Sequence, residues 1–414
     1  MVPNGWEETR LKHIARIKSG STPLRAKQDL YYSQDGTPWV KTLDLNNAEI
    51  FETDERITEL ALKETSCSIF PVNTVLVAMY GGFNQIGRTG LLTVPSAINQ
   101  ALSGLMLDDT KADSKYILNY LNGNILQWKK FAASSRKDPN ITREDVCNFE
   151  VLLPPLPEQR KIAKILSTWD KAIATTERLI DAGKRQKKAL MQQLLTGKKR
   201  LVDPEMGKTF EGDWEEVRLS QLVKVTGGNA FKSEQFATQG IPLIKISNIK
   251  ADYSVNVDSS VFIVEESKYE KFKVKTGDVL IAMSGATTGK VGCYRFNDFS
   301  YLNQRVGRFD PKKNKIIKPY LFQLLKLPKV QHDILIDAVG GAQPNISNKD
   351  IERLKVKVPA IGEQQKIASV LTAADKEIEL LEAKLAHLKE EKKALMQQLL
   401  TGKRRVKVEH TEAA

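Results

Sequence analysis

Two long segments of the chain carry apolar residues at spacings that alternate between four and three, which is the heptad pattern of a coiled-coil helix. Each segment begins near an acidic residue, Glu158 or Glu363, and ends near a glycine, Gly197 or Gly402, as helices commonly do. The sequence therefore predicts two helices of about five heptads each. The predicted seam residues are Ile162, Leu166, Trp169, Ile173, Ile180, Leu190, Leu194, Ile367, Leu371, Ile378, Leu381, Leu385, Leu388, Leu395 and Leu399.

The two helical segments are copies of one another. Glu158–Lys198 aligns with Glu363–Lys403 at a shift of 205 residues, without a gap and with 23 identities in 41 positions. Shorter copies lie upstream of each segment: WEETRL at Trp6–Leu11 and WEEVRL at Trp214–Leu219, VLVAMYG and VLIAMSG, PNIT and PNIS, and the Asn-Gln pairs at 99–100 and 303–304. Between these anchors the halves differ almost completely, so we interpret the chain as a tandem duplication with nearly constant helices and diverged globular domains.

Each predicted helix has the other as its best partner. A 40-residue helix is about 60 Å long, which exceeds what one small domain covers. The first helix must lead from the first domain to the second, and the second helix must return to lie alongside it. We therefore expect an antiparallel pair, with the packing of each helix on its own domain alone as the alternative.

The globular domains are predicted to be α+β, because short β-rich runs surround one helical stretch in each. The Gly-rich turns favour a small twisted, antiparallel sheet. The predicted fold class is thus α+β, with two similar domains separated by two long helices that form an antiparallel coiled coil with cyclic pseudo-twofold symmetry. The predicted boundaries are 1–153 for the first domain, 154–200 for the first helix, 201–358 for the second domain, 359–405 for the second helix and 406–414 for a tail.

The composition is basic, with 63 Lys+Arg against 50 Asp+Glu and a net charge of +13. This excess makes nucleic acid the first partner class to test. It is uneven, because residues 158–200 carry 12 basic and 4 acidic side chains, whereas residues 1–157 carry 17 and 18. There is no signal-like N-terminus and no run near 18 apolar residues, so we expect a cytoplasmic protein without membrane contact.

Motifs for catalysis and metal binding are not found in the sequence. The three cysteines form no Cys-x-x-Cys pair and the four histidines lie in unrelated contexts, which argues against a zinc module or a disulfide scaffold. The segment Gly285–Val291 is one residue too short for a phosphate-binding loop and has Val in place of the hydroxyl that would hold magnesium. We therefore expect this chain to catalyse nothing by itself and to hold no cofactor or metal.

The proline-rich helix starts, LPPLPEQRKIAKIL and VPAIGEQQKIASVL, the doubled KKALMQQLLTGK and the WEE-x-RL domain starts resemble the specificity subunit of a Type I restriction-modification enzyme. The resemblance covers essentially the whole chain. It implies two variable target recognition domains that select a bipartite, asymmetric double-stranded DNA sequence, and helices that set the gap. It also implies two methylation subunits and two restriction/translocation subunits as partners, with S-adenosylmethionine, ATP and Mg²⁺ bound by those partners and adenine as the modified base.

The parts of the chain that are nearly the same in both copies are the predicted docking surface for methylation subunits. These are the Pro-x-x-Pro-Glu-Gln start of the first helix with its counterpart PAIGEQ in the second, and the exposed helix flanks, with Lys188, Gln192 and Gln193. Intramolecular packing alone is the alternative reason for their likeness. At the level of the whole protein, the alternatives are a coiled-coil adaptor that binds proteins and an intact methyltransferase or nuclease.

The candidates for DNA contact are polar and basic residues of the most diverged loops. Arg, Asn and Gln pair with guanine or adenine edges, whereas Lys and Ser more often contact phosphates. In the first domain the candidates are Lys18, Ser19, Thr22, Arg25, Lys27, Asn84, Gln85, Arg88, Ser135, Arg136 and Lys137. In the second they are Asn229, Lys232, Ser247, Asn248, Lys250, Thr287, Thr288, Lys290, Asn303, Gln304, Arg305 and Gln343.

Overall fold

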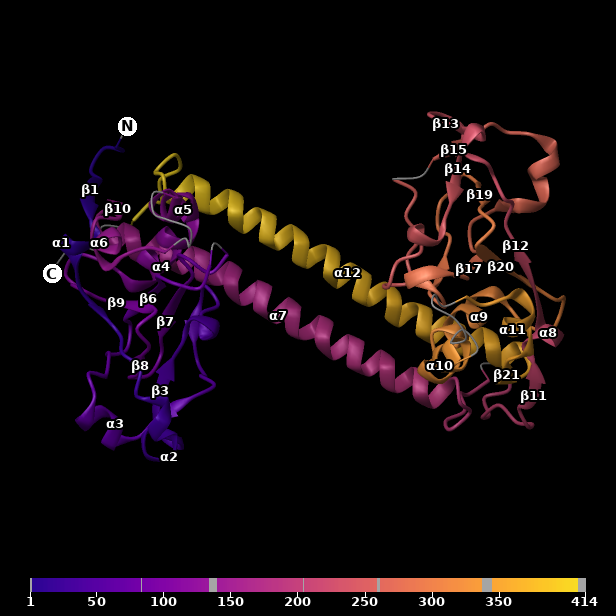
Figure 1. Ribbon diagram of the computed structural model, residues 1–414, viewed down its shortest axis with the longest axis horizontal. Coiled ribbons are helices and arrows are strands. Elements are labelled where there is room, and N and C mark those ends of the chain that lie inside the picture. Colours follow the sequence, from indigo (N-terminus) through magenta and orange to yellow (C-terminus); the bar gives the residue numbers. More distant parts are fainter. Residues whose placement is uncertain are drawn as a thin grey trace. The chain divides into compact units, whose positions relative to one another are not determined.

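The computed structural model describes residues 2–82, 84–133, 140–203, 205–258, 261–336 and 345–408. The chain divides into two compact units, which we call unit 1 (Met1–Glu177 with Ala383–Ala414) and unit 2 (Arg178–Glu382). Each unit contains one α+β domain and one half of each of two long helices, α7 (Leu156–Leu194) and α12 (Ile361–Leu399) (Figure 1).

The two long helices run antiparallel within each unit. In unit 1, Lys389 Nζ lies 2.7 Å from a carboxylate oxygen of Glu177, and Lys392 binds Asp170. In unit 2, Lys184 Nζ lies 2.6 Å from Glu382, and Lys187 binds Asp375. Residue numbers fall along one helix as they rise along the other, which confirms the predicted direction. The same ion pairs occur once in each unit, with the two helices exchanged.

The predicted seam is buried or half-buried at all fifteen positions. Towards the helix ends the seam residues join the domain cores: Ile162 and Leu166 in unit 1, Ile367 and Leu371 in unit 2. The two packing alternatives are therefore both realised, because each helix packs on its domain near its end and on the other helix further along. Each helix ends before a glycine with left-handed backbone, Gly197 with φ +71° and Gly402 with φ +68°.

Unit 1 builds its domain from three sheets. The five-stranded sheet has the order β2-β9-β6-β7-β4, and smaller sheets pair β5-β3-β8 and β1-β10. The strands are β1 (Glu7–Arg10), β2 (Ala15–Ser19), β3 (Tyr32–Val40), β4 (Glu49–Ile50), β5 (Arg56–Ile57), β6 (Val75–Ala78), β7 (Thr89–Leu92), β8 (Ala97–Ile98), β9 (Leu102–Leu107) and β10 (Glu150–Leu153). The helices are α1 (Leu11–Ile14), α2 (Gln28–Tyr31), α3 (Glu59–Glu64), α4 (Ser114–Gly123), α5 (Ile125–Ala133) and α6 (Arg143–Cys147).

Unit 2 repeats this plan with altered sheets, in the orders β12-β20-β17-β18, β13-β15-β14-β19-β16 and β11-β21. Its strands are β11 (Glu215–Arg218), β12 (Val223–Gly227), β13 (Phe236–Ala237), β14 (Ile241–Ile244), β15 (Phe262–Ile263), β16 (Lys273–Val274), β17 (Val279–Ala282), β18 (Val291–Cys293), β19 (Ser300–Leu302), β20 (Val306–Pro311) and β21 (Lys355–Val358). Its shorter helices are α8 (Leu219–Leu222), α9 (Lys318–Leu325), α10 (Pro328–Ile336) and α11 (Asn348–Arg353).

The sheets are mostly antiparallel, as predicted, but three pairings between described strands are parallel: β3 with β8, β4 with β7, and β14 with β19. The apolar runs of β6 and β17 are buried at every position, which places them at the centre of their sheets. Helices α4 and α9 cover these sheets with Tyr116 and Tyr320, both fully buried.

A buried carboxylate fixes the start of each long helix. Glu158 of α7 is 3% exposed and receives two hydrogen bonds of 2.7 Å from the guanidinium of Arg405 and one of 3.2 Å from Trp6 Nε1. Glu363 of α12 is 1% exposed and receives 2.6 and 2.7 Å bonds from Arg200 and a 3.2 Å bond from Trp214 Nε1. We call each set of three residues an Arg–Glu–Trp clasp.

The glutamine after each clasp carboxylate is also used inside the fold. Gln159 is fully buried and its Nε2 donates to the carbonyls of Pro154 and Lys111, at 2.8 and 2.9 Å. Gln364 repeats this with Pro359 at 2.9 Å. The Glu-Gln pair within the predicted docking surface is thus already bound inside the fold, whereas Pro155, Pro157 and Arg160 beside it are exposed.

Candidate nucleic-acid interface

In unit 1 the segment after β2 crosses closely over the loop between β8 and β9. The N–H groups of Gly20 and Ser21 donate to the carbonyls of Leu102 and Ile98, at 3.1 and 3.0 Å. A Cβ at Gly20 would lie 2.2 Å from the carbonyl oxygen of Ile98. Only glycine can make this approach.

Unit 2 contains the same crossing. The N–H groups of Gly228 and Asn229 donate to the carbonyls of Val306 and Leu302, at 3.1 and 2.9 Å, and a Cβ at Gly228 would lie 2.2 Å from the carbonyl oxygen of Asn303. The two domains have therefore diverged around a constant backbone arrangement. We call each arrangement the crossing loops, comprising residues 19–22 and 98–102 in unit 1 and residues 227–230 and 302–306 in unit 2.

The Asn-Gln pair lies at the centre of the crossing loops in both units. Asn99 Oδ1 accepts a hydrogen bond from Ala101 N–H at 3.2 Å, and Asn303 Oδ1 accepts one from Gln304 N–H at 2.6 Å. The asparagines thus hold the turn, whereas Gln100 and Gln304 are exposed. The prediction omitted Gln100, although the duplicated pair was the signal that could have found it.

The ends of the central strands hold the crossing loops in place. Met79 N–H, just after β6, donates to Ala101 O at 2.8 Å, and its carbonyl accepts from Ile141 N–H at 3.0 Å. In unit 2, Met283 stands in the same place, with Arg305 O at 2.9 Å and Ile346 N–H at 2.9 Å. A buried strand, a tight turn and the isoleucine Ile141 or Ile346 therefore meet at one edge of each domain.

Several predicted residues of unit 1 gather near this edge. Ser19 and Thr22 belong to the crossing loops, and the Thr22 hydroxyl contacts Gln100 Oε1. Lys18 is exposed, with Nζ 2.9 Å from Ser68 Oγ. Asn84, Gln85 and Arg88 lie in the loop that follows β6.

Two other predicted residues of unit 1 are engaged within the fold. Arg25 forms a 2.7 Å ion pair with Glu55 and lies over the ring of Tyr32, 4.4 Å from its centroid. Lys27 Nζ lies 3.0 Å from the hydroxyl of Tyr31. The charge of Arg25 is thus paired with Glu55, and Lys27 Nζ also lies 3.8 Å from a carboxylate oxygen of Glu64.

In unit 2, Asn229, Asn303, Gln304 and Arg305 belong to the crossing loops. Lys232 follows at the start of a 3₁₀ turn, Ser247 and Lys250 are exposed after β14, and Thr287 and Lys290 lie between β17 and β18.

Asn248 and Thr288 are turned inward, at 3% and 8% exposed. Asn248 Nδ2 donates to Asn256 O at 2.7 Å, and Thr288 Oγ1 donates to Gly285 O at 2.7 Å. Such burial argues against base contacts for these two. The predicted residues Ser135, Arg136, Lys137 and Gln343 lie outside the described residues.

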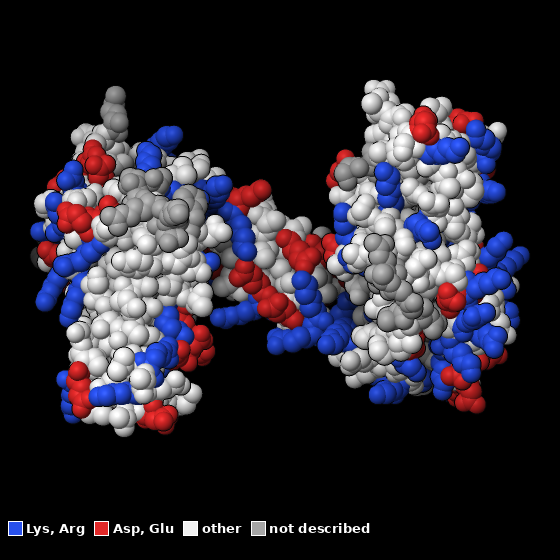
Figure 2. Space-filling model, viewed as in Figure 1, with Lys and Arg blue, Asp and Glu red and all other residues white. Residues whose placement is uncertain are grey.

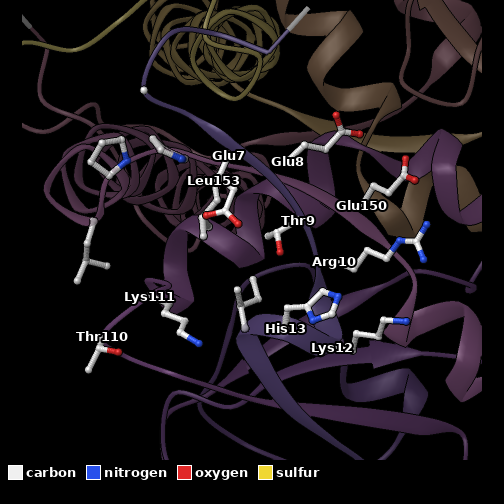
Figure 3. A pocket seen from close by; sticks show the side chains of 15 residues that line it. Glu7, Glu8, Thr9, Arg10, Lys12, His13, Thr110, Lys111, Glu150 and Leu153 are labelled. Carbon is white, nitrogen blue, oxygen red and sulfur yellow. The ribbon is translucent and has the colours of Figure 1, made fainter.

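A pocket of about 1050 Å³ opens beside the β1-β10 pair of unit 1 (Figure 3). Its wall alternates acidic and basic side chains, with Glu7, Glu8 and Glu150 near Arg10 and Lys12. The mixed charge does not suit a polyanion, and none of its lining residues belongs to the crossing loops. This pocket is therefore a poor candidate for a nucleic-acid interface.

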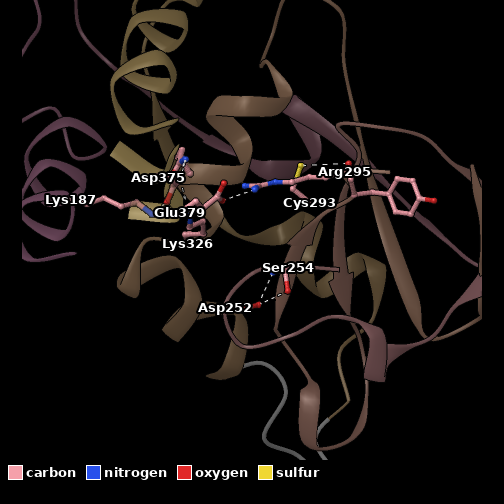
Figure 4. A network of polar contacts seen from close by, with 10 residues as sticks. Lys187, Asp252, Ser254, Cys293, Arg295, Lys326, Asp375 and Glu379 are labelled. Carbon is pink, nitrogen blue, oxygen red and sulfur yellow. Dashed lines mark hydrogen bonds and ion pairs between the residues drawn. The ribbon is translucent and has the colours of Figure 1, made fainter. Parts of the chain in front are cut away.

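A buried ionic cluster joins the long helices to α9 and the residue after it in unit 2 (Figure 4). Asp375 binds Lys187, Gln323 Nε2 at 2.8 Å and Lys326 Nζ at 3.2 Å. Burial lowers the pKa of Lys326 to about 8, against the opposing effect of Asp375. Burial also acts to raise the pKa of Asp375, but the hydrogen bonds from Lys187 and Gln323 outweigh it, so that the pKa is lowered.

Along the helix flanks, acidic and basic side chains are interspersed (Figure 2). Part of the basic excess of α7 is thus paired with α12. Within the described ranges, no three His, Cys, Asp or Glu residues come together as metal ligands would. Among the helices that the structure describes, none is both long and apolar enough to span a bilayer.

The family described as "Type I restriction modification DNA specificity domain" matches the chain twice, over residues 3–182 and 211–390. The chain belongs to this family. It is a specificity subunit with two recognition domains, and the resemblance seen in its sequence is confirmed. Specificity subunits do not catalyse, so this chain is a non-catalytic subunit.

Similar proteins span nearly the whole chain. The Type I restriction enzyme MjaVIII specificity subunit of Methanocaldococcus jannaschii is 28% identical over 98% of this chain and 94% of its own length. The EcoKI specificity subunit of Escherichia coli K12 is 22% identical over 88% and 81%. The crystal structure of the S subunit of M. genitalium is 18% identical, with a TM-score of 0.64, and covers 97% of this chain and 98% of its own. This likeness confirms the predicted fold class.

Proposed function

We propose that each recognition domain reads one half of a split, asymmetric DNA target and that the long helices set the gap and dock the methylation subunits. The observation that carries this proposal is the pair of crossing loops, which share one backbone arrangement but differ in most side chains. Two unlike half-sites can be recognised by one backbone arrangement if it carries different side chains in each domain.

The duplicated contacts of the chain support a twofold mode of binding. The ion pairs Asp170–Lys392 and Lys187–Asp375 are the same contact with the two helices exchanged. Proteins that read two half-sites use such a relation, because double-stranded DNA has its own local twofold axes. Since the domains differ in sequence, the half-sites should differ as well.

The side chains divide by chemistry into phosphate and base contacts. Basic side chains near the crossing loops would hold the backbone, and amides and Arg would read base edges. The proposed contacts of unit 1 are Lys18, Ser19, Thr22, Asn84, Gln85 and Arg88. Those of unit 2 are Asn229, Lys232, Ser247, Lys250, Thr287, Lys290, Gln304 and Arg305.

The helix flanks support docking of two copies of one partner. Lys188, Gln192 and Gln193 of α7 are exposed, and the identical residues of α12, at positions 393, 397 and 398, are exposed too. Packing within the chain does not require exposed residues to be the same in both copies. We propose that these flanks bind two methylation subunits, which bind S-adenosylmethionine, and that two restriction subunits with ATP and Mg²⁺ complete the complex.

Co-expression with the methylation subunit, followed by sequencing of methylated bases across a genome, tests the proposal. We expect one split motif with two unlike half-sites. A chain with Lys188→Ala, Gln192→Ala and Gln193→Ala should bind less methylation subunit, while Arg88→Ala should alter DNA selection with assembly intact. A contiguous motif, or DNA affinity that does not fall with added salt, would contradict the proposal.

A further inference from the structure

The Asn-Gln pair is identical in two loops that otherwise differ. The segment around it reads SAINQALSG in unit 1 and SYLNQRVGR in unit 2. Asn99 and Asn303 are explained by the turn, since each side chain caps a nearby N–H group. The turn does not explain Gln100 and Gln304, whose side chains are exposed.

The backbone presents both glutamines rigidly. Each lies between a glycine crossing and a hydrogen bond from the end of the central strand, which Met79 donates in unit 1 and Met283 in unit 2. A side chain on a fixed backbone loses less conformational entropy when it binds, which suits a recognition residue.

The contacts of the two side chains leave their amide groups available. The Thr22 hydroxyl contacts Gln100 Oε1, which leaves a second lone pair on that oxygen and the whole NH₂ group. In unit 2 the equivalent of Thr22 is Ala230, and among the residues that the structure describes the Gln304 side chain has no hydrogen-bond partner. The fold therefore does not account for the identity of Gln304 with Gln100.

We propose that Gln100 and Gln304 make the same base contact in both half-sites, each pairing through Oε1 and Nε2 with N6 and N7 of an adenine. This inference rests on the proposed function. The diverged side chains read what differs between the half-sites, so an exposed side chain that the crossing loops of both units share reads what the half-sites have in common. Glutamine and adenine match in this way, with one acceptor and one donor on each partner. In unit 1 the Thr22 hydroxyl donates to Gln100 Oε1, which agrees with the role of this oxygen as the acceptor in the pairing.

The test compares Gln100→Ala, Gln304→Ala and the wild-type chain, each assembled with methylation subunits, on a library in which every base of both half-sites is varied. Gln34→Ala, which removes another exposed glutamine of unit 1, is the matched control. We expect each variant to slow methylation of the cognate target about 10- to 100-fold and to relax discrimination at one position of one half-site. Both relaxed positions should be adenine. The control should change neither quantity.

Gln304→Glu provides a second variant, because it keeps the size of the side chain but removes its NH₂ donor and should also lose adenine preference. Thermal unfolding of every variant checks the fold. A uniform loss across all sequences would indicate a phosphate contact and overturn the inference, as would unchanged discrimination. If the wild-type chain itself yields no split motif, the proposed function fails; if it does and the variants behave like the control, only this inference fails.

Discussion

The Arg–Glu–Trp clasps offer a matched pair of stability perturbations, Arg405→Ala in unit 1 and Arg200→Ala in unit 2. Each arginine satisfies both oxygens of a carboxylate, Glu158 or Glu363, whose side chain is 4% or 1% exposed. Without the arginine, one Trp N–H remains as the only side-chain partner among the described residues. Removing one partner of a buried ion pair typically lowers the free energy of unfolding by about 3–5 kcal/mol.

The two sites should not respond equally. The Arg405 side chain is 43% exposed and that of Arg200 is 23% exposed, so water reaches the vacated position more easily in unit 1. We expect a loss of about 2–3 kcal/mol for Arg405→Ala and about 3–5 kcal/mol for Arg200→Ala. In a unit of this size each kcal/mol lowers the unfolding temperature by about 2–4 °C.

Calorimetry of the full chain, combined with limited proteolysis to identify the unit that opens, measures both losses. Arg404→Ala is the control, because the neighbouring Arg404 is exposed, and it should stay within about 0.5 kcal/mol of the wild type. Arg405→Lys should restore only part of the loss, because lysine cannot bind a carboxylate through two parallel bonds.

Replacing the buried carboxylate of Glu158 tests whether an unpaired charge causes the loss of stability. In a Glu158→Gln background, Arg405→Ala should cost clearly less than in the wild type, because no unpaired carboxylate is left behind. The reasoning is refuted if Arg405→Ala is as harmless as Arg404→Ala, or if its cost is unchanged in the Glu158→Gln background.

Three further outcomes are expected. Inserting four residues midway along both α7 and α12 lengthens each helix by about 6 Å. Since one base pair spans about 3.4 Å, sequencing of methylated sites should show a gap that is longer by one or two base pairs. Changed half-sites with the old gap would refute this prediction. Urea unfolding should show stability rising from about pH 8 towards pH 10, because over that range the unfolded chain holds a proton that Lys326 has lost in the fold, and Lys326→Met should abolish the rise. Gly20→Ala and Gly228→Ala each place a Cβ 2.2 Å from a carbonyl oxygen, so each should impair methylation through one half-site only; a pair of variants with wild-type methylation would contradict the crossing loops as the reading edge.

At the crossing loops, the sequence alone did not identify which polar side chains are exposed. The candidate list took polar residues from diverged loops, and it included Asn248 and Thr288, which are buried. It could not separate residues that cap a turn from residues that face outward, because both kinds are polar and both favour loops. Gln100 was missed although its counterpart Gln304 was a candidate, because the duplication was not used to carry candidates from one domain to the other.

The burial of the Glu-Gln pair at each helix start could not be predicted for a related reason. Glu158 and Gln159 are duplicated at Glu363 and Gln364, and a duplicated polar pair can serve a partner or the fold. Their hydrogen-bond partners lie far along the chain: Arg405 is 247 residues from Glu158, and Trp6 is 152. No spacing rule connects such residues, so only the folded chain shows that the pair is already bound.

The sequence by itself determined the duplication, the two long helices, their seam and the family. Heptad spacing is a local pattern, and a repeat is found by comparing the sequence with itself, so neither requires the fold. The antiparallel direction also followed, from the length of the helices and the order of the segments. Only the tertiary structure decided which strands pair, which polar residues are buried in clasps and which are displayed at the crossing loops. These outcomes depend on contacts between residues distant in the sequence, where burial, not residue type, decides whether a polar side chain stabilises the fold or remains free to bind.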